Sequence, residues 1–299
     1  MAVDLGALRI GFVGAGRLGT SLAWSIAQRG MRVVAASDAI PASAERLAAK
    51  IPGCRITGMQ DVIDGCDLVF ITTPDELIES TAAQGRWRPK MFAVHCSGVT
   101  DVSALESAEA AGAVAGGFHP MQTFGDPGAA VRSLPGCTIT IEAKEPLNAV
   151  LVAIAERLAC RVNRLPAGMR GRYHAAAGIT SQFINALFRE ASTIWQTWGA
   201  TEEDAVRALL PLARGTLESI ESVGICKGMP GPVSRGDVAS IEKHVAALRP
   251  LGDDAMEFYR LLCGRTIPLA LECGAIDETA AARFRETLAE SAREREVAT

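Results

Sequence analysis

The chain has 299 residues, of which 48% are hydrophobic and 21% are charged. This composition is typical of a globular protein with room for two domains. Its 30 basic and 34 acidic residues give a formal charge of −4, and the basic residues are scattered, which excludes an extended surface for nucleic acid. The apolar runs are too short to cross a bilayer and the first residues lack the features of a signal peptide, so we expect a cytoplasmic protein.

The first half alternates short apolar runs with amphipathic segments. Strands are predicted at 8–13, 31–37, 67–72, 91–97, 113–118, 137–142 and 160–165, and helices at 17–30, 41–50, 73–84 and 146–159. In the helix at 73–84, Thr73 and Glu76 have the spacing of a capping box and Pro74 occupies the first helical position. Strands alternating with helices predict an α/β fold, a doubly wound parallel Rossmann sheet.

The pattern becomes helical after residue 165 and stays so almost to the end. Helices are predicted at 172–199, 202–222, 238–249, 254–274 and 278–296. Asp237 is a candidate N-cap for the helix that follows it, and Pro268 is expected to kink its helix. We therefore predict a dinucleotide-binding domain at 1–165 and an all-α domain at 166–299.

The eight cysteines are scattered, without a C-x-x-C pair or a histidine at zinc-finger spacing. In a cytoplasmic protein this favours small, buried thiols. No metal site is predicted.

The strongest motif is the run GFVGAGRLG, in which Gly14, Gly16 and Gly19 follow an apolar strand and open an amphipathic helix. In a dinucleotide-binding turn the first glycine permits the bend, the second lets a diphosphate approach the backbone, and the third lets helix and strand pack closely. Free N–H groups at the helix N-terminus favour the same anion. The alternative is a glycine-rich turn without a ligand. The predicted cofactor-binding residues here are Gly14, Ala15, Gly16, Arg17, Leu18 and Gly19.

Asp38 ends the second predicted strand. A carboxylate at this place can bond the adenosine ribose and repel a 2′-phosphate, which favours NAD over NADP. The alternative is that Asp38 caps the helix that begins near Pro41.

Polar residues also follow three further strands, whose carboxyl ends are where ligands of open α/β sheets lie. They are Thr72, Thr73 and Pro74, then His95, Cys96, Ser97 and Gly98, and finally His119. We add Thr72, Thr73, Pro74, Cys96 and Ser97 to the predicted cofactor-binding residues.

The motifs GAGRLG, HCSG, GFHPMQTF, YHAAA and GPVSRGD occur in this order between residues 14 and 237. With them, the chain resembles bacterial proteins that join a Rossmann-like domain to a C-terminal helical domain of initially unknown function. These belong with the 6-phosphogluconate dehydrogenase-like reductases, beside ketopantoate reductase and pyrroline-5-carboxylate reductase. The resemblance implies a nicotinamide cofactor, NAD or NADP, a small carbonyl or imine substrate, and a homodimer built through the helical domain.

The chain departs from the pattern of these reductases in three places. Ser37-Asp38 replaces a Ser-Arg pair suited to NADP, and Ser181-Gln182 replaces Ser-Asn. The catalytic lysine of the wider superfamily has no counterpart, because the helical half has only Lys227 and Lys243. The chemistry of ketopantoate reductase therefore cannot be transferred residue by residue.

Hydride transfer from a nicotinamide needs a group that gives a proton to the developing alkoxide or amine, and a histidine suits this near neutral pH. His174 and His119 are the candidates. We favour His174 as the donor, with Ser181 and Gln182 two turns along its helix to hold the substrate, and His119 as a wall of the pocket. The alternative is that both histidines are structural.

Arg235, beside Asp237 at a predicted helix start, is a candidate for binding a substrate carboxylate. A surface ion pair in which Asp237 caps the helix would explain the same residues. Arg170 and Arg172 are equally suited as anchors.

The expected function is an NAD(P)-dependent oxidoreductase, acting on CH-OH or CH-NH groups, that transfers a hydride to the carbonyl of a small 2-keto acid similar to ketopantoate. One alternative is a cyclic imine reductase similar to pyrroline-5-carboxylate reductase. Another is a dinucleotide-binding sensor or scaffold without turnover. No nucleic-acid or membrane partner is expected.

Overall fold

The computed structural model describes residues 4–298, which form two compact units divided after Gln182. The predicted border at residue 165 coincides with the end of the sheet, whose last strand is Arg161–Arg164. The unit extends to Gln182 because the next helix, α8 (Arg170–Thr180), begins with a side chain buried in the first unit. Arg170 on that helix is 1% exposed and reaches Ser97, 73 residues earlier in the chain.

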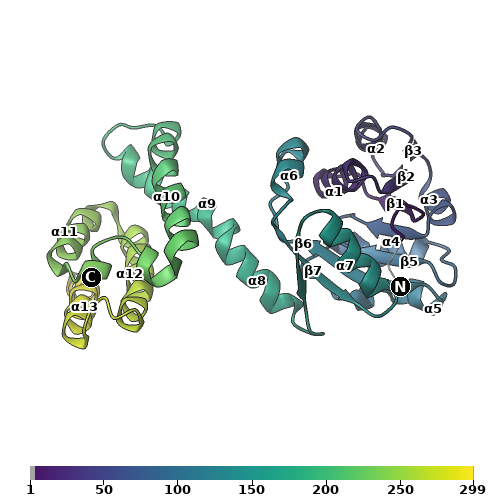
Figure 1. The fold of residues 1–299 in the computed structure, drawn as a ribbon. Helices are drawn as coiled ribbons and strands as arrows, with labels where there is room; N and C mark the ends of the chain where they lie inside the picture. The colour runs from purple at the N-terminus through teal and green to yellow at the C-terminus, as the bar shows by residue number, and fades with distance from the viewer. Residues whose placement is uncertain (1–3, 299) are drawn as a thin grey trace. The chain divides into compact units, whose positions relative to one another are not determined.

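An eight-stranded sheet in the order β3-β2-β1-β4-β5-β6-β7-β8 forms the centre of the first unit (Figure 1). Its strands are β1 (Arg9–Val13), β2 (Arg32–Ser37), β3 (Arg55–Ile56), β4 (Leu68–Ile71), β5 (Phe92–His95), β6 (Val114–Pro120), β7 (Thr138–Ala143) and β8 (Arg161–Arg164). All neighbouring strands are parallel except β6 and β7, which pair antiparallel with His119 opposite Thr140. The order of the first six strands is that of a dinucleotide-binding sheet, so the predicted fold class is confirmed.

Helices cover both faces of this sheet, because alternate strand residues point to opposite sides. The helices are α1 (Arg17–Gln28), α2 (Pro41–Ala48), α3 (Met59–Gly65), α4 (Ile78–Gln84), α5 (Glu106–Ala110), α6 (Pro127–Ser133) and α7 (Leu147–Arg157). Phe12 and Phe70 belong to the core shared with α1, α2 and α7, whereas Val69 and Ile71 belong to the core shared with α3, α4 and α5. In open sheets of this kind, ligands bind beyond the carboxyl ends of the strands.

The predicted capping box at Thr73 and Glu76 is wrong. The chain after β4 first makes a 3₁₀ turn, Asp75–Leu77, and α4 begins at Ile78. Pro74, rather than Thr73, precedes the turn, and the hydroxyl of Thr73 is buried without a hydrogen-bond partner in the described part of the chain.

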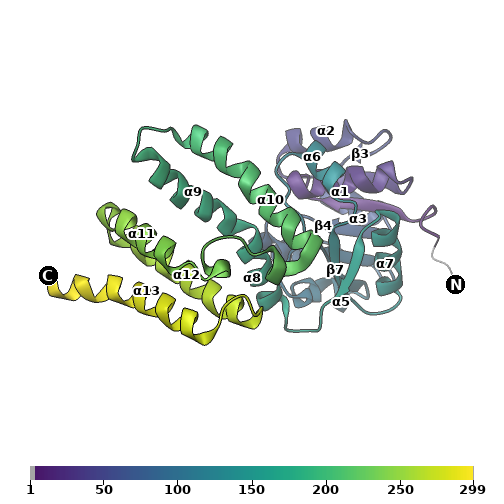
Figure 2. The same ribbon diagram turned by 60° about the vertical axis from the view of Figure 1, so that its left-hand side comes forward.

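The second unit is helical, as predicted. It contains α9 (Gln182–Gln196), α10 (Glu202–Gly228), α11 (Val238–Leu248), α12 (Asp253–Glu272) and α13 (Glu278–Ala298). Buried residues of α11, α12 and α13 form one core, and Figure 2 shows these three helices beside one another. Asp237 caps α11 by accepting the N–H of Ser240 at 3.0 Å, which confirms that prediction. The helix predicted at 172–199 is divided at Ser181, and α12 continues through Pro268.

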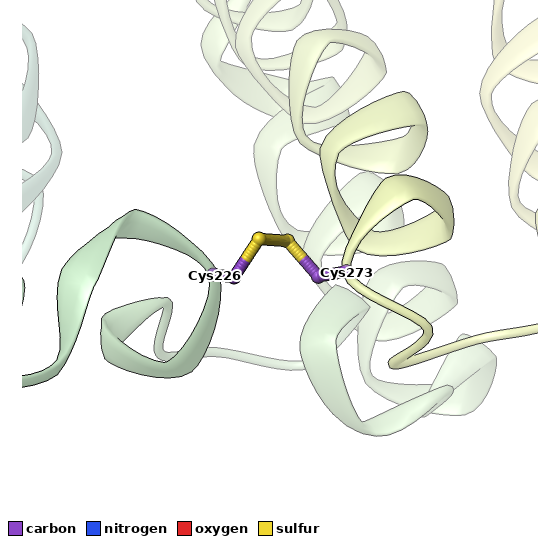
Figure 3. The surroundings of a disulfide bond; sticks show 2 residues. All are labelled: Cys226 and Cys273. Carbon is purple, nitrogen blue, oxygen red and sulfur yellow. A yellow bond between two sulfur atoms is a disulfide. The ribbon is translucent and has the colours of Figure 1, made fainter.

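A disulfide joins Cys226, near the end of α10, to Cys273, just after α12 (Figure 3). The expectation of small, buried thiols is wrong for these two residues, since Cys226 is exposed and Cys273 is half-buried. The other six cysteines are free. Neither partner has a nearby second cysteine in sequence, so spacing gave no signal for the pair.

None of the helices in residues 4–298 combines the length and the hydrophobicity needed to cross a membrane.

Candidate functional site

The glycine loop between β1 and α1 has the geometry that its sequence predicts. Gly14 has φ of +103° and its N–H donates to the carbonyl of Ser37 at 2.8 Å. A Cβ at Gly19 would lie 2.4 Å from the Gly14 carbonyl oxygen, so this glycine allows α1 to pack against the loop. A Cβ at Gly16, in contrast, would have no neighbour within 4 Å. Space is therefore open above Gly16 and closed at the other two positions.

This loop fits the diphosphate of a dinucleotide. Gly16 is the N-cap of α1 and, with Arg17, is exposed, and no side chain of the described residues caps the helix. The first N–H groups of α1 are thus free to bind an anion, supported by the positive end of the helix dipole. The unpartnered hydroxyl of Thr73 offers a further polar group near the loop, since a Cβ on Gly14 would lie 2.8 Å from the Thr73 nitrogen.

Asp38 has a structural task that its position after β2 did not reveal. One carboxylate oxygen accepts the N–H of Ala15 at 2.6 Å and the other accepts the N–H of Ile40 at 2.7 Å. Asp38 therefore ties the glycine loop to the end of β2. Both of its oxygens already accept backbone hydrogen bonds.

The residues after β5 divide into a buried core and a turn. Cys96 lies in the hydrophobic core of the first unit, and burial raises the pKa of its thiol. Ser97 organises the turn by accepting the N–H groups of Val99 and Thr100. Its own N–H donates to Nδ1 of His95 at 3.2 Å.

His95 is held neutral. It is fully buried, and burial, followed by the charge of Arg170, lowers its pKa to about 3. Its Nε2 has no hydrogen-bond partner among the described residues.

Arg170 occupies the space beside Gly117 of β6. Its Nε donates to Glu142 at 2.6 Å and its Nη1 to the carbonyl oxygen of Ser97 at 2.8 Å. A Cβ on Gly117 would lie 1.9 Å from Nη2, so only glycine leaves room for the guanidinium. The role of substrate anchor does not fit a side chain enclosed in this way.

His119 and Tyr173 form the polar centre of the first unit. Nδ1 of His119 and the hydroxyl of Tyr173 are 2.7 Å apart, and their rings meet edge to face at 5.5 Å. Burial, followed by the charges of His174 and Arg170, lowers the pKa of His119 to about 4. The imidazole is therefore neutral at pH 7, and burial raises the pKa of the Tyr173 phenol.

A cavity of about 370 Å³ lies beside this pair and is formed within the first unit. His119, His174, Ser181 and Gln182, the four predicted catalytic residues, all line it. The rings of His119 and His174 are 6.2 Å apart, and a Cβ on Gly98 would touch both. His174 itself is exposed. The structure thus brings these four residues together, while Arg235 belongs to the second unit, exposed in the 3₁₀ turn Val233–Arg235.

Sequence reasoning missed the residues that hold the histidines. Tyr173 was part of the quoted motif YHAAA, yet its bond to His119 spans 54 residues. Glu142 and Thr140 lie on β7, which had no motif to distinguish it. The one sequence signal for any of these residues was that Tyr173 directly precedes the candidate His174.

Comparisons with known proteins match two consecutive parts of the chain. A family model for a Rossmann-like domain matches residues 2–120, and the domain of unknown function DUF2520 matches residues 137–266. The chain combines a Rossmann-like domain with a DUF2520 domain. This confirms the resemblance drawn from the sequence motifs. No curated protein matches the chain.

Several solved structures share the fold over most of this chain. A candidate NADP oxidoreductase from Bacteroides fragilis is 25% identical, with a TM-score of 0.67 over 88% of this chain and 99% of its own. A reductive aminase from Aspergillus terreus, solved with NADPH4, cyclohexanone and allyl amine, is 16% identical, with a TM-score of 0.60 over 93% and 99%. Pyrroline carboxylate reductase from Plasmodium falciparum, solved with NADP, is 14% identical, with a TM-score of 0.58 over 94% and 100%.

Proposed function

We propose that this protein is a nicotinamide-dependent oxidoreductase that reduces the carbonyl of a small 2-keto acid. The observation that carries the proposal is the neutral His119 on Tyr173, which lines a cavity at the sheet edge where the glycine loop also lies. The fold neighbours described as binding NADP or NADPH support the class of cofactor.

The chain's own residues have four tasks in this reaction. The N–H groups of Gly16, Arg17 and Leu18 bind the diphosphate. A bound reduced nicotinamide supplies a hydride, which with one proton converts C=O into CH–OH and leaves the oxidised ring. His119 orients the carbonyl oxygen by a hydrogen bond and stabilises the charge that develops there. The exposed His174 supplies the proton, and Ser181 and Gln182 hold the substrate.

Titration calorimetry with NADPH and NADH tests the cofactor, and oxidation of each with ketopantoate, other 2-keto acids and pyrroline carboxylate tests the reaction. We expect His119→Ala and His174→Ala each to lower kcat/KM by about 100-fold, the usual effect of general acid–base groups. His244→Ala is the matched control, because His244 also bonds a tyrosine, Tyr259 at 2.8 Å, but lies on α11. Full activity in both site variants would refute the roles of these histidines.

Two alternatives give different results in the same assays. A cyclic imine reductase would oxidise the cofactor with pyrroline carboxylate and not with keto acids. A sensor or scaffold would bind the cofactor tightly and turn over neither substrate. We propose Arg235 as the partner of a substrate carboxylate on the chemistry of its guanidinium group alone. Arg235→Ala should therefore raise KM for keto acids and leave neutral ketones unchanged.

We propose that the protein prefers NAD to NADP, and the charge of Asp38 is the only support for this preference. The similar structures with a bound nucleotide hold NADP or NADPH instead. Repulsion of a 2′-phosphate by this carboxylate predicts a lower Kd for NADH than for NADPH. Asp38→Asn keeps an oxygen that can accept the N–H of Ala15 but removes the charge. The preference for NADH over NADPH, measured as the ratio of their Kd values, should then fall about tenfold, which corresponds to roughly 1.4 kcal/mol. Tighter binding of NADPH to the unaltered protein would contradict the preference.

We also propose a homodimer through α9 and α10. Among the described residues of α10, which spans 27, Ala205 and Gly228 are buried, and α9 buries Ser192. Apolar side chains of both helices line a groove of about 420 Å³, and Leu212 and Leu217 are 67% and 55% exposed. Helices derive most of their stability from packing, so these two need a partner surface.

The oligomeric state, measured by light scattering during gel filtration, tests this interface. Leu212→Glu and Leu217→Glu should yield monomers. Leu261→Glu, at a side chain 58% exposed on α12, is the control and should stay dimeric. A monomeric unaltered protein would exclude the proposal.

A further inference from the structure

Two of the free cysteines lie side by side at the start of neighbouring strands. Cys137 directly precedes β7, and Cys160 directly precedes β8. The two strands are parallel, and Thr138 lies opposite Arg161 in their register. The backbone pairing reaches the cysteines as well, because the N–H of Arg161 donates to the carbonyl oxygen of Cys137 at 2.8 Å. Cys137 and Cys160 are therefore cross-strand neighbours.

This placement satisfies the geometry of a disulfide. The two sulfur atoms are 3.7 Å apart. Neighbouring strands of a sheet are about 4.8 Å apart, and disulfides join residues whose Cα atoms are roughly 4.4–6.8 Å apart. Because the backbones already have this separation, bringing the sulfur atoms to the about 2 Å of a covalent bond needs movement of the side chains alone. The register of β7 and β8, with the hydrogen bond from Asn163 to Thr140 at 3.1 Å, can stay as it is.

The two thiols differ in exposure. Cys137 is half-buried, whereas Cys160 is 9% exposed and donates its S–H to the carbonyl oxygen of Leu134 at 3.2 Å. A dissolved oxidant therefore reaches Cys137 first. The hydrogen bond between the two thiols also lowers the pKa of Cys137, because the S–H of Cys160 stabilises a thiolate at that position. The thiolate is the form of cysteine that attacks a disulfide.

We propose that Cys137 and Cys160 are a redox-active pair that reacts with a small disulfide of the glutathione type, with Cys137 as the attacking thiol and Cys160 as the resolving thiol. The Cys137 thiolate attacks one sulfur of the oxidant, forms a mixed disulfide and releases one thiolate. Cys160 then attacks Sγ of Cys137, forms the internal disulfide and releases the second thiolate. The pair is oxidised by two electrons, and the two released thiolates take up the protons that the cysteines lose.

Thiol counting and peptide mapping test the pair in the unaltered protein. The protein is incubated with glutathione disulfide, its remaining thiols are alkylated in denaturant, and a tryptic digest is analysed by mass spectrometry without reductant. Cleavage after Lys144 and Arg157 places the two cysteines in different peptides, so a link between them joins two peptides. We expect two of the six free thiols to disappear and the Cys137–Cys160 link to form. An unchanged number of thiols, or a lasting glutathione adduct on Cys137 in place of the link, overturns the proposal.

Two variants separate the roles of the thiols. Cys160→Ser leaves Cys137 without a resolving partner, so this variant should retain one glutathione on Cys137 and form no link. Cys137→Ser should carry no glutathione on Cys160, because that thiol is buried. An adduct on Cys160, or none on Cys137 in Cys160→Ser, would overturn the assigned order of attack.

Cys54→Ser is the matched control. Cys54 is half-buried, as Cys137 is, but within residues 4–298 it has no hydrogen bond to another sulfur. Its replacement should leave the yield of the Cys137–Cys160 link unchanged. Loss of the link in Cys54→Ser would mean that oxidation passes through Cys54, and it would contradict direct attack by Cys137.

Discussion

Arg170 and Glu142 form an ion pair of 2.6 Å beside the histidine cluster, across 28 residues of sequence. The Arg170 side chain is 1% exposed and that of Glu142 is 20% exposed. Their bond fastens the start of α8 to β7, and thus the helix that carries Tyr173 and His174 to the sheet that carries His119. The geometry of the proposed site depends on this attachment.

The first prediction concerns this pair. Arg170→Met should lower the free energy of unfolding by about 3 kcal/mol, because it leaves Glu142 without its partner in a mostly buried place. Arg170→Met combined with Glu142→Leu should recover part of the loss. Denaturant unfolding followed by circular dichroism measures both, and a double variant no more stable than the single one would contradict this explanation.

The fold could be predicted because its sequence signals are local. The contacts that hold the candidate site together could not, because they join residues far apart in the sequence. The glycine loop, the strands and the cap at Asp237 each depend on a few consecutive residues. Tyr173 meets His119 across 54 residues and Arg170 meets Ser97 across 73, so their contacts exist only after the sheet forms. Asp38 was placed correctly after β2, but its bond to Ala15 depends on how two strand ends meet.

Gly16 and Gly19 should respond differently to the same substitution. Gly19→Ala places a methyl group 2.4 Å from the Gly14 carbonyl oxygen, so it should destabilise the first unit. Gly16→Ala meets nothing within 4 Å and should leave thermal stability unchanged, while it weakens binding of NADH and NADPH at least tenfold by obstructing the diphosphate. Calorimetry and thermal unfolding of both variants separate the effects. Unaltered cofactor affinity in Gly16→Ala would argue against binding at this loop.

Stability should fall as the pH drops below about 6.5. Burial holds the pKa of His119 at about 4 and that of His95 at about 3, below the usual 6.5. Between these values the unfolded chain binds protons that the folded protein refuses, so the stabilising contribution is complete above pH 6.5 and is lost as the pH falls. The slope is at most about 1.4 kcal/mol per pH unit for each histidine.

Denaturant unfolding at several pH values between 4.5 and 7.5 measures this slope. His119→Gln should flatten it, since one of the two titrating groups is removed. Parallel curves for the unaltered protein and His119→Gln would mean that the imidazole is not kept neutral by its surroundings.

The disulfide between Cys226 and Cys273 should stabilise the second unit. It closes a loop of 47 residues, and the loss of chain entropy in the unfolded state corresponds to about 4 kcal/mol. Reduction should therefore lower the unfolding midpoint of the helical unit, and Cys226→Ser with Cys273→Ser should show the same midpoint with and without reductant. Thiol titration of the unfolded protein provides the direct check. Six reactive thiols before reduction support the bond, whereas eight would show that both cysteines are free and that the helices of the second unit hold together by packing alone.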